Sequence, residues 1–159
     1  YKLTYLGKSG RWVKVKYKGK TGYVYDSYVS SVKGSGSNKN ESNNNKSSLV
    51  SYAKTKLGKP YVWGAQGPNS FDCSGLMYYL FKQYGIYVSP ASSAIPGGGA
   101  DVGGIGNAQP GDIVCYPGHV ALYIGGGQVI HAPQPGDVVK ISSADMGGTM
   151  SIIAVRRYW

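Results

Sequence analysis

The fold class of this 159-residue chain is decided by one stretch, Gly118-His119-Val120-Ala121-Leu122-Tyr123-Ile124-Gly125-Gly126-Gly127-Gln128-Val129-Ile130-His131-Ala132. Residues 119–124 and 128–132 are apolar runs of strand length, and the three glycines between them are typical of a hairpin turn. Three further runs extend the predicted pair into an antiparallel sheet: 113–116, 138–141 and 152–157.

The two histidines of the chain, His119 and His131, fall on the two strands of this hairpin. A turn centred on Gly125 places His119 directly opposite His131, with Cβ atoms roughly 5 Å apart. A turn centred on Gly126 places His131 opposite Ala121 instead, on a diagonal from His119. Either register brings the imidazoles to one face, and an ordinary polar surface pair is the alternative interpretation.

Two helices are predicted before the sheet. The first covers residues 49–57, opened by Ser48 and closed by Gly58, and the second covers residues 72–84, where apolar residues recur with helical spacing. Residues 86–109 are rich in glycine, serine and proline and are predicted to form a long loop of the kind that often carries function. Helices followed by strands favour an α+β domain over a parallel βαβ design.

The N-terminal third differs in composition from the rest. Residues 12–17 alternate in character and residues 21–25 follow a turn, so we expect a hairpin within residues 1–33. This piece is too short to bury much surface alone. Residues 34–48 contain no apolar side chain and are predicted to be a flexible linker. The compact domain is therefore expected over residues 49–159.

The net charge of +10 is uneven, because residues 1–46 carry +8 and residues 47–159 carry +2. Such a basic segment either keeps the protein soluble or attracts a polyanion, and charge alone does not separate nucleic acid, anionic membrane and anionic cell-wall polymer. No stretch approaches the ~20 apolar residues of a membrane span, and no signal peptide is visible. Because the chain begins with Tyr1, we expect a processed or trimmed product.

Cys73 is the candidate nucleophile. It lies at the predicted start of a helix, where unpaired amides carry partial positive charge, so we expect a lowered thiol pKa and a reactive thiolate. A buried structural cysteine is the alternative interpretation. The chain has one other cysteine, Cys115, so a single disulfide is arithmetically possible.

A cysteine, a base and an orienting group are the parts of an activated thiol. In this interpretation His119 takes the thiol proton and later protonates the leaving amine, while His131 holds the ring of His119. One cysteine and two histidines could also ligate zinc, but no ligand pair has a typical spacing. We therefore predict no metal and no cofactor.

Five motifs in order resemble the NlpC/p-sixty family of peptidoglycan peptidases across essentially all of residues 49–159. They are Pro60-Tyr61-Val62-Trp63-Gly64, Asp72-Cys73-Ser74-Gly75-Leu76, Pro110-Gly111-Asp112-Ile113-Val114, Gly118-His119-Val120-Ala121-Leu122-Tyr123-Ile124-Gly125 and Val129-Ile130-His131-Ala132. The resemblance implies a papain-like fold, a Cys73-His119-His131 triad and an acyl-enzyme. It also implies cleavage between γ-D-glutamate and the diamino acid of peptidoglycan stem peptides.

The resemblance assigns four further residues to the oxyanion or the substrate: Tyr61, Asp72, Ser74 and, more weakly, Ser92. Asp72 could equally be a residue favoured at a helix start by the dipole. The backbone N–H of Cys73 is a natural oxyanion donor. This chain has Ala91 where many members have arginine, which leaves substrate contacts in that loop open. We interpret Cys115 as a core residue.

Residues 1–33 resemble the C-terminal part of a bacterial SH3-like domain. The resemblance implies a module that binds the cell wall, and its charge of +7 would favour anionic wall polymers. We therefore expect a monomeric, secreted or wall-associated cysteine endopeptidase of a bacterium, phage or mobile element that does not bind nucleic acid. An amidase or acyl transferase on the same fold, or a catalytically inactive wall-binding protein, are the alternatives.

Overall fold

The computed structural model describes residues 4–9, 12–17, 20–25 and 38–159, which belong to two compact units, 1–37 and 38–159. Among these residues no helix is long and apolar enough to cross a membrane. The first unit contains an antiparallel sheet of strands β1 (Thr4–Ser9), β2 (Trp12–Tyr17) and β3 (Lys20–Tyr25). The hairpin predicted within residues 12–25 is confirmed. The SH3-like resemblance remains a prediction, and its residues 27–29 lie outside the described residues.

Strand β2 presents lysines on one face of this small sheet. Lys14 and Lys16 are exposed and lie two residues apart, so their side chains share a face. The register places Lys14 opposite Tyr23 and Lys16 opposite Thr21, both of which are exposed. This face of the first unit is therefore cationic in its centre with an aromatic ring beside it.

The prediction of a linker over residues 34–48 is wrong from Asn38 onward, because helix α1 (Asn38–Lys54) begins there. Ser48 is consequently inside the helix and does not cap it. The apolar side chains of α1 lie near its C-terminal end, where Leu49 and Ala53 are buried. Once those turns pack, each added residue extends an existing helix and avoids the cost of nucleation.

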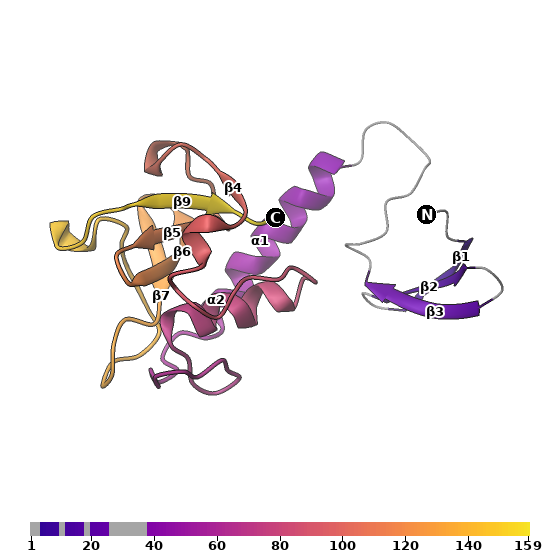
Figure 1. Ribbon diagram of the computed structural model, residues 1–159, viewed down its shortest axis with the longest axis horizontal. Coiled ribbons are helices and arrows are strands. Elements are labelled where there is room, and N and C mark those ends of the chain that lie inside the picture. The colour runs from indigo at the N-terminus through magenta and orange to yellow at the C-terminus, as the bar shows by residue number, and fades with distance from the viewer. Residues whose placement is uncertain (1–3, 10–11, 18–19, 26–37) are drawn as a thin grey trace. The chain divides into compact units, whose positions relative to one another are not determined.

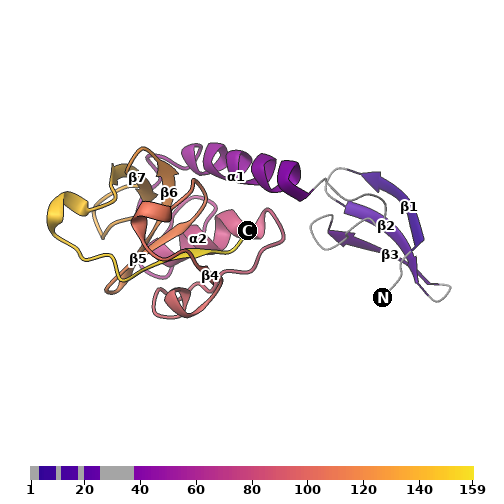
Figure 2. The same ribbon diagram turned by 90° about the horizontal axis from the view of Figure 1, so that it is seen from above.

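A six-stranded antiparallel sheet forms the centre of the second unit, in the order β4-β9-β5-β6-β7-β8. Figures 1 and 2 show it beside helices α1 and α2 (Cys73–Lys82). The α+β class is therefore confirmed. The strands are β4 (Ala100–Asp101), β5 (Ile113–Tyr116), β6 (His119–Gly125), β7 (Gln128–His131), β8 (Lys140–Ser143) and β9 (Ala154–Arg157).

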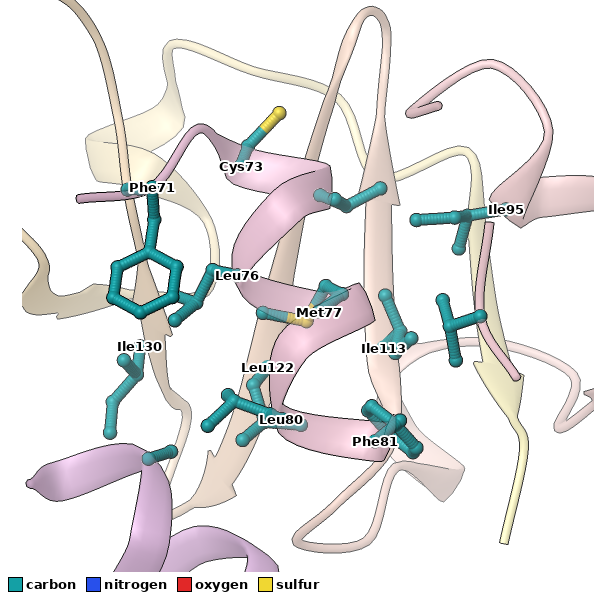
Figure 3. Packing of buried hydrophobic residues seen from close by; sticks show 14 of the residues in the cluster. Phe71, Cys73, Leu76, Met77, Leu80, Phe81, Ile95, Ile113, Leu122 and Ile130 are labelled. Carbon is teal, nitrogen blue, oxygen red and sulfur yellow. The ribbon is translucent and has the colours of Figure 1, made fainter. Parts of the chain in front are cut away.

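The core lies on both faces of this sheet because side chains alternate along each strand. Helix α2 covers one face, where Leu76, Met77, Leu80 and Phe81 pack against strand residues such as Ile113 (Figure 3). On the opposite face the buried residues are Val114, Tyr116, Ala121, Val129, Ala144 and Val155. Cys115 is fully buried in the first cluster, which confirms its interpretation as a core residue.

The long segment 86–109 is a loop with short regular pieces, namely β4 and two 3-10 helices, η2 (Ile95–Gly97) and η3 (Ile105–Asn107). Strand β9 and the residue that follows it, Tyr158, anchor this segment. Arg156 Nε donates to the carbonyl of Gly98 at 2.6 Å, and Tyr158 Oη donates to the carbonyl of Ile95 at 2.8 Å. The predicted loop is thus tied to the sheet from one side.

Candidate active site

Cys73 is the first residue of α2, and Asp72 is the residue that caps this helix. One carboxylate oxygen of Asp72 accepts the backbone N–H of Gly75 at 2.6 Å, and the other accepts the backbone N–H of Gly64 at 2.9 Å. The side chain therefore satisfies an otherwise unpaired amide of the first turn and ties the 60–66 segment to it. This arrangement matches the helix-start interpretation of Asp72.

The Cys73 thiol lies within hydrogen-bonding reach of the backbone N–H of Val120, the second residue of β6. Figure 3 shows the side chain at the first turn of α2, pointing away from the apolar residues of the helix. Burial raises the pKa of the Cys73 thiol above its usual value, and the nearby Asp72 carboxylate adds to the increase. The backbone N–H groups of Val120, Ser74 and Cys73 itself lower the pKa, but they do not outweigh burial. The expected lowering of the thiol pKa is therefore wrong in this structure.

The two histidines are brought together across the β6–β7 hairpin. Leu122 pairs with Ile130 and Tyr123 with Val129, a register that continues to Ala121 opposite His131. The diagonal arrangement is thus the one adopted, with a register shift next to Gly125. His119 Nε2 lies 2.8 Å from His131 Nδ1, so the two rings share a hydrogen bond.

Burial keeps both imidazoles neutral. His119 is 8% exposed and His131 is 4% exposed. Burial lowers the pKa of His119 to about 4, and burial with the nearby charge of His119 lowers the pKa of His131 to about 4. A neutral imidazole has a free lone pair at pH 7, and because Nε2 of His119 faces His131, its Nδ1 is the nitrogen available to a thiol.

Strand β8 adds a residue that the sequence analysis did not identify. Ser142 Oγ lies 2.8 Å from His131 Nε2, so three polar side chains on β6, β7 and β8 form a row. Ser142 pairs with Val129, two residues before His131, which puts it on the same face of the sheet. The only sign of this contact in the sequence is a serine shortly after the β7 strand. The connection over residues 132–139 is too long to predict the register between β7 and β8.

Tyr116 is a second residue that the sequence analysis missed. Its ring lies against His119, with centroids 5.8 Å apart, and its hydroxyl donates to the carbonyl of Ala144. Tyr116 precedes His119 by three residues across the β5–β6 turn, where the two pair directly. The ring of His119 therefore has Tyr116 and His131 as its aromatic neighbours.

Tyr61 lies at the edge of the site. Its backbone N–H donates to the carbonyl of Asp137 at 2.9 Å, and it forms a bridge with Phe71 just before the helix. Burial raises the pKa of the Tyr61 hydroxyl, and the charges of Cys73 and Asp72 raise it further. The tyrosine is therefore close enough to the nucleophile to interact with it electrostatically.

Ser74 uses its hydroxyl within the protein. It donates to the carbonyl of Pro90 at 2.7 Å, and this contact joins α2 to the start of the long loop. The Ser74 side chain is buried. Ser92 is half-buried and follows Pro90 by two residues in the chain.

Neither cysteine forms a disulfide, and both are buried. Burial raises the pKa of Cys115 to about 11, and its place in the core separates it from the row of histidines. Within residues 38–159 and the described strands of the first unit, no group of three or more His, Cys, Asp or Glu side chains is arranged to hold a metal ion.

A profile described as the NlpC/P60 family matches residues 58–156, a span that contains Cys73, His119 and His131. The chain belongs to the NlpC/P60 family. Its relatives include a protein of Mycobacterium tuberculosis H37Rv named a probable endopeptidase, 36% identical over 116 residues that make up 71% of this chain and 29% of that protein. A probable endopeptidase p60 of Listeria grayi is 44% identical over 95 residues, 57% of this chain and 18% of that protein.

The family's fold is also found among solved structures. The crystal structure of the NlpC/p60 domain of the peptidoglycan hydrolase SagA has a TM-score of 0.63 and 34% identity, covering 70% of this chain and 97% of that domain. The chain spans less than a third of the two curated relatives above. Membership of this peptidoglycan hydrolase and endopeptidase family agrees with the resemblance carried by the five motifs.

Proposed function

We propose that the unit 38–159 is a cysteine endopeptidase that cleaves peptidoglycan stem peptides, with Cys73 as its nucleophile. One arrangement supports this most strongly: the backbone N–H of Val120 reaches the Cys73 thiol, Val120 follows His119 in β6, and the His119 ring is hydrogen-bonded to His131 at 2.8 Å. These are the nucleophile, base and orienting group of a thiol peptidase. The names of the relatives, endopeptidase and peptidoglycan hydrolase, favour the same substrate class.

The reaction starts from the neutral thiol of Cys73 and the neutral imidazole of His119. Nδ1 of His119 takes the thiol proton as the sulfur attacks the scissile carbonyl, so the sulfur–carbon bond forms while the imidazole becomes cationic. The backbone N–H of Cys73, at the first position of α2, has no partner within the helix and is suited to the carbonyl oxygen. His119 then protonates the leaving amine, and the C–N bond breaks to leave an acyl-enzyme. Water completes hydrolysis with His119 again as base.

We propose the γ-D-glutamyl–diamino acid bond as the scissile bond, because the five motifs match family members with this specificity. Two residues differ from the substrate contacts that the resemblance implies. Ala91 stands where many family members have arginine, and the Ser74 hydroxyl already donates to the carbonyl of Pro90. An amidase or acyl transferase would use the same thiol and imidazole and remains the alternative activity. Because peptidoglycan lies outside the cytoplasmic membrane, we also propose a secreted or wall-associated location.

Mass spectrometry of digested walls tests the bond. Purified peptidoglycan treated with the protein is expected to release fragments that begin with the diamino acid, leaving D-glutamate at the cut end of the remaining stem. Fragments lacking the bond between the glycan and the stem would identify an amidase instead. Transfer of the acyl group to an added amine in preference to water would identify a transferase.

We further propose that the first unit contributes to binding of anionic cell-wall polymers. The support is its charge of +7 over residues 1–33 and the exposed Lys14 and Lys16 on one face of β2. Positive charge gathered on one face raises the local concentration of a polyanion. A catalytically inactive wall-binding protein would need this unit but would have no use for the Cys73–His119–His131 arrangement.

A further inference from the structure

Ser142 has no role in the mechanism proposed above. Its hydroxyl lies 2.8 Å from His131 Nε2, and His131 Nδ1 lies 2.8 Å from His119 Nε2. Both nitrogens of His131 are therefore engaged, one with the base and one with the serine. His131 is 4% exposed, so water does not substitute freely for either partner.

Proton placement along this row depends on the direction of each hydrogen bond. In one arrangement His119 donates from Nε2 to His131 Nδ1, and His131 donates from Nε2 to Ser142. In the other, Ser142 donates to His131 Nε2, and His131 donates from Nδ1 to His119. Only the first arrangement leaves a lone pair on Nδ1 of His119 to accept the thiol proton.

When His119 is charged, only one of these two hydrogen-bond arrangements is possible. When His119 holds the thiol proton, both of its nitrogens carry hydrogen and both donate. His131 must then accept at Nδ1, which requires its own proton at Nε2 and an acceptor beyond it. The Ser142 oxygen is in position to be that acceptor, and it adds no negative charge to the buried row.

We propose that Ser142 is a positioning residue that accepts the Nε2–H of His131 and thereby supports His119 in the state that has taken the thiol proton. The inference rests on the proposed function of Cys73 and His119. Removal of the hydroxyl leaves a buried N–H without an acceptor when His119 is charged. The cost of such a group corresponds to roughly a 5- to 100-fold loss in rate.

The matched variants are Ser142→Thr and Ser142→Val, which have nearly the same shape and differ in the hydroxyl. We expect Ser142→Val to lower kcat about 5- to 100-fold with KM unchanged, and Ser142→Thr to retain most of kcat. Ser143→Ala is the control, because Ser143 is the next residue of β8, is exposed and bonds instead to Asp145 at 2.7 Å. Equal kcat for the valine and threonine variants would overturn the proposal.

Nitrogen NMR provides a second measurement that does not depend on activity. The chain has two histidines, so histidine-selective ¹⁵N labelling of the untagged protein gives four ring nitrogens. At pH 7 both rings are expected to carry their proton on Nε2, and Ser142→Val is expected to shift His131 partly to the Nδ1–H form. A wild-type His131 with its proton on Nδ1 contradicts the proposal. If the wild type releases no peptide, the proposed function fails and the spectra alone decide the role of Ser142.

Discussion

At His119, the packing of the ring explains how an ordinary imidazole becomes suited to its proposed task. Tyr116 and His131 lie against it, with ring centroids 5.8 and 5.1 Å away, and little of the side chain reaches solvent. Desolvation disfavours the charged form and lowers the pKa of His119 to about 4. The base is therefore neutral and ready to accept a proton well below pH 7.

The pH dependence of kcat/KM follows from this shift. His119 accepts a proton only when neutral, so activity should stay near its pH 7 level at pH 5.5 and fall as the pH drops through about 4. The measurement is the rate of cleavage of a soluble stem peptide between pH 3.5 and 8. Half-maximal activity near pH 6.5, the usual histidine value, would contradict the account.

Unfolding must be followed at each pH, because the same shift affects stability. The unfolded histidine has a pKa of about 6.5 and the folded one about 4, so the unfolded state binds more protons between these values. Each buried imidazole therefore contributes stability that is complete above pH 6.5 and is lost as the pH falls to 4, at most about 3 kcal/mol. Circular dichroism at each pH separates loss of fold from loss of base.

The sequence predicted Cys73, His119 and His131 as a group because the motifs and the hairpin turn are local signals. The sequence led us to expect a lowered pKa for the Cys73 thiol, which is wrong. The side chain is only 9% exposed, and this burial depends on tertiary packing. The sequence analysis also missed Ser142, whose contact with His131 depends on the register of β7 and β8. No sequence pattern determines that register when residues 132–139 form an irregular connection.

Among the elements, helix α2 depends on a close backbone approach in its first turn. A Cβ added at Gly75 would lie 2.0 Å from the carbonyl oxygen of Ala65 and 2.7 Å from the Asp72 carboxylate. Neither the backbone nor the cap can move without shifting Cys73, two residues earlier. Glycine is therefore required at this position for packing.

Gly75→Ala is expected to lower the free energy of unfolding by roughly 2–4 kcal/mol and to reduce activity in the fraction that folds. Chemical denaturation and peptide release measure the two effects. Gly106→Ala is the control, because its Cβ would meet no atom within 4 Å and its φ is not positive. Equal stability of the two variants would contradict the close approach of α2 to Ala65.

Helix α1 shows where prediction of elements failed. Residues 38–48 are polar, so no apolar periodicity indicated a helix there. In the structure Lys46 Nζ donates to Gln109 Oε1 at 3.1 Å and lies 5.0 Å from the ring centroid of Trp159. These partners are far away in the chain, so local composition could not reveal them. Short apolar runs and glycine turns, by contrast, predicted β5, β6, β7, β9 and part of β8, whereas β4 lies in the segment that was predicted to be a loop.

At the scale of the whole molecule, we propose that the basic first unit binds the cell wall and that the second unit cleaves stem peptides. Lys14→Gln/Lys16→Gln should weaken binding to purified walls about two- to tenfold at low salt, because surface charges contribute little individually and salt screens them. Cleavage of a soluble stem peptide should be unchanged. Sedimentation with insoluble walls, repeated at increasing salt, measures the binding.

Lys54→Gln/Lys82→Gln removes the same charge from exposed positions of the second unit and is the matched control. If both double variants bind walls more weakly than the wild type, and by the same factor, net charge alone explains the attraction. If neither differs from the wild type, the first unit does not bind walls through this face. The linker that composition predicted over residues 34–48 overlaps the first part of α1.

The most direct test of the central claim compares the two cysteines. Peptide release from purified peptidoglycan is measured by mass spectrometry for the wild type, Cys73→Ala and Cys115→Ala. The account predicts that Cys73→Ala loses at least about a thousandfold of the activity, whereas Cys115→Ala keeps it and loses on the order of 1 kcal/mol of stability. Release by Cys73→Ala at the wild-type rate would contradict the assignment of Cys73 as the nucleophile.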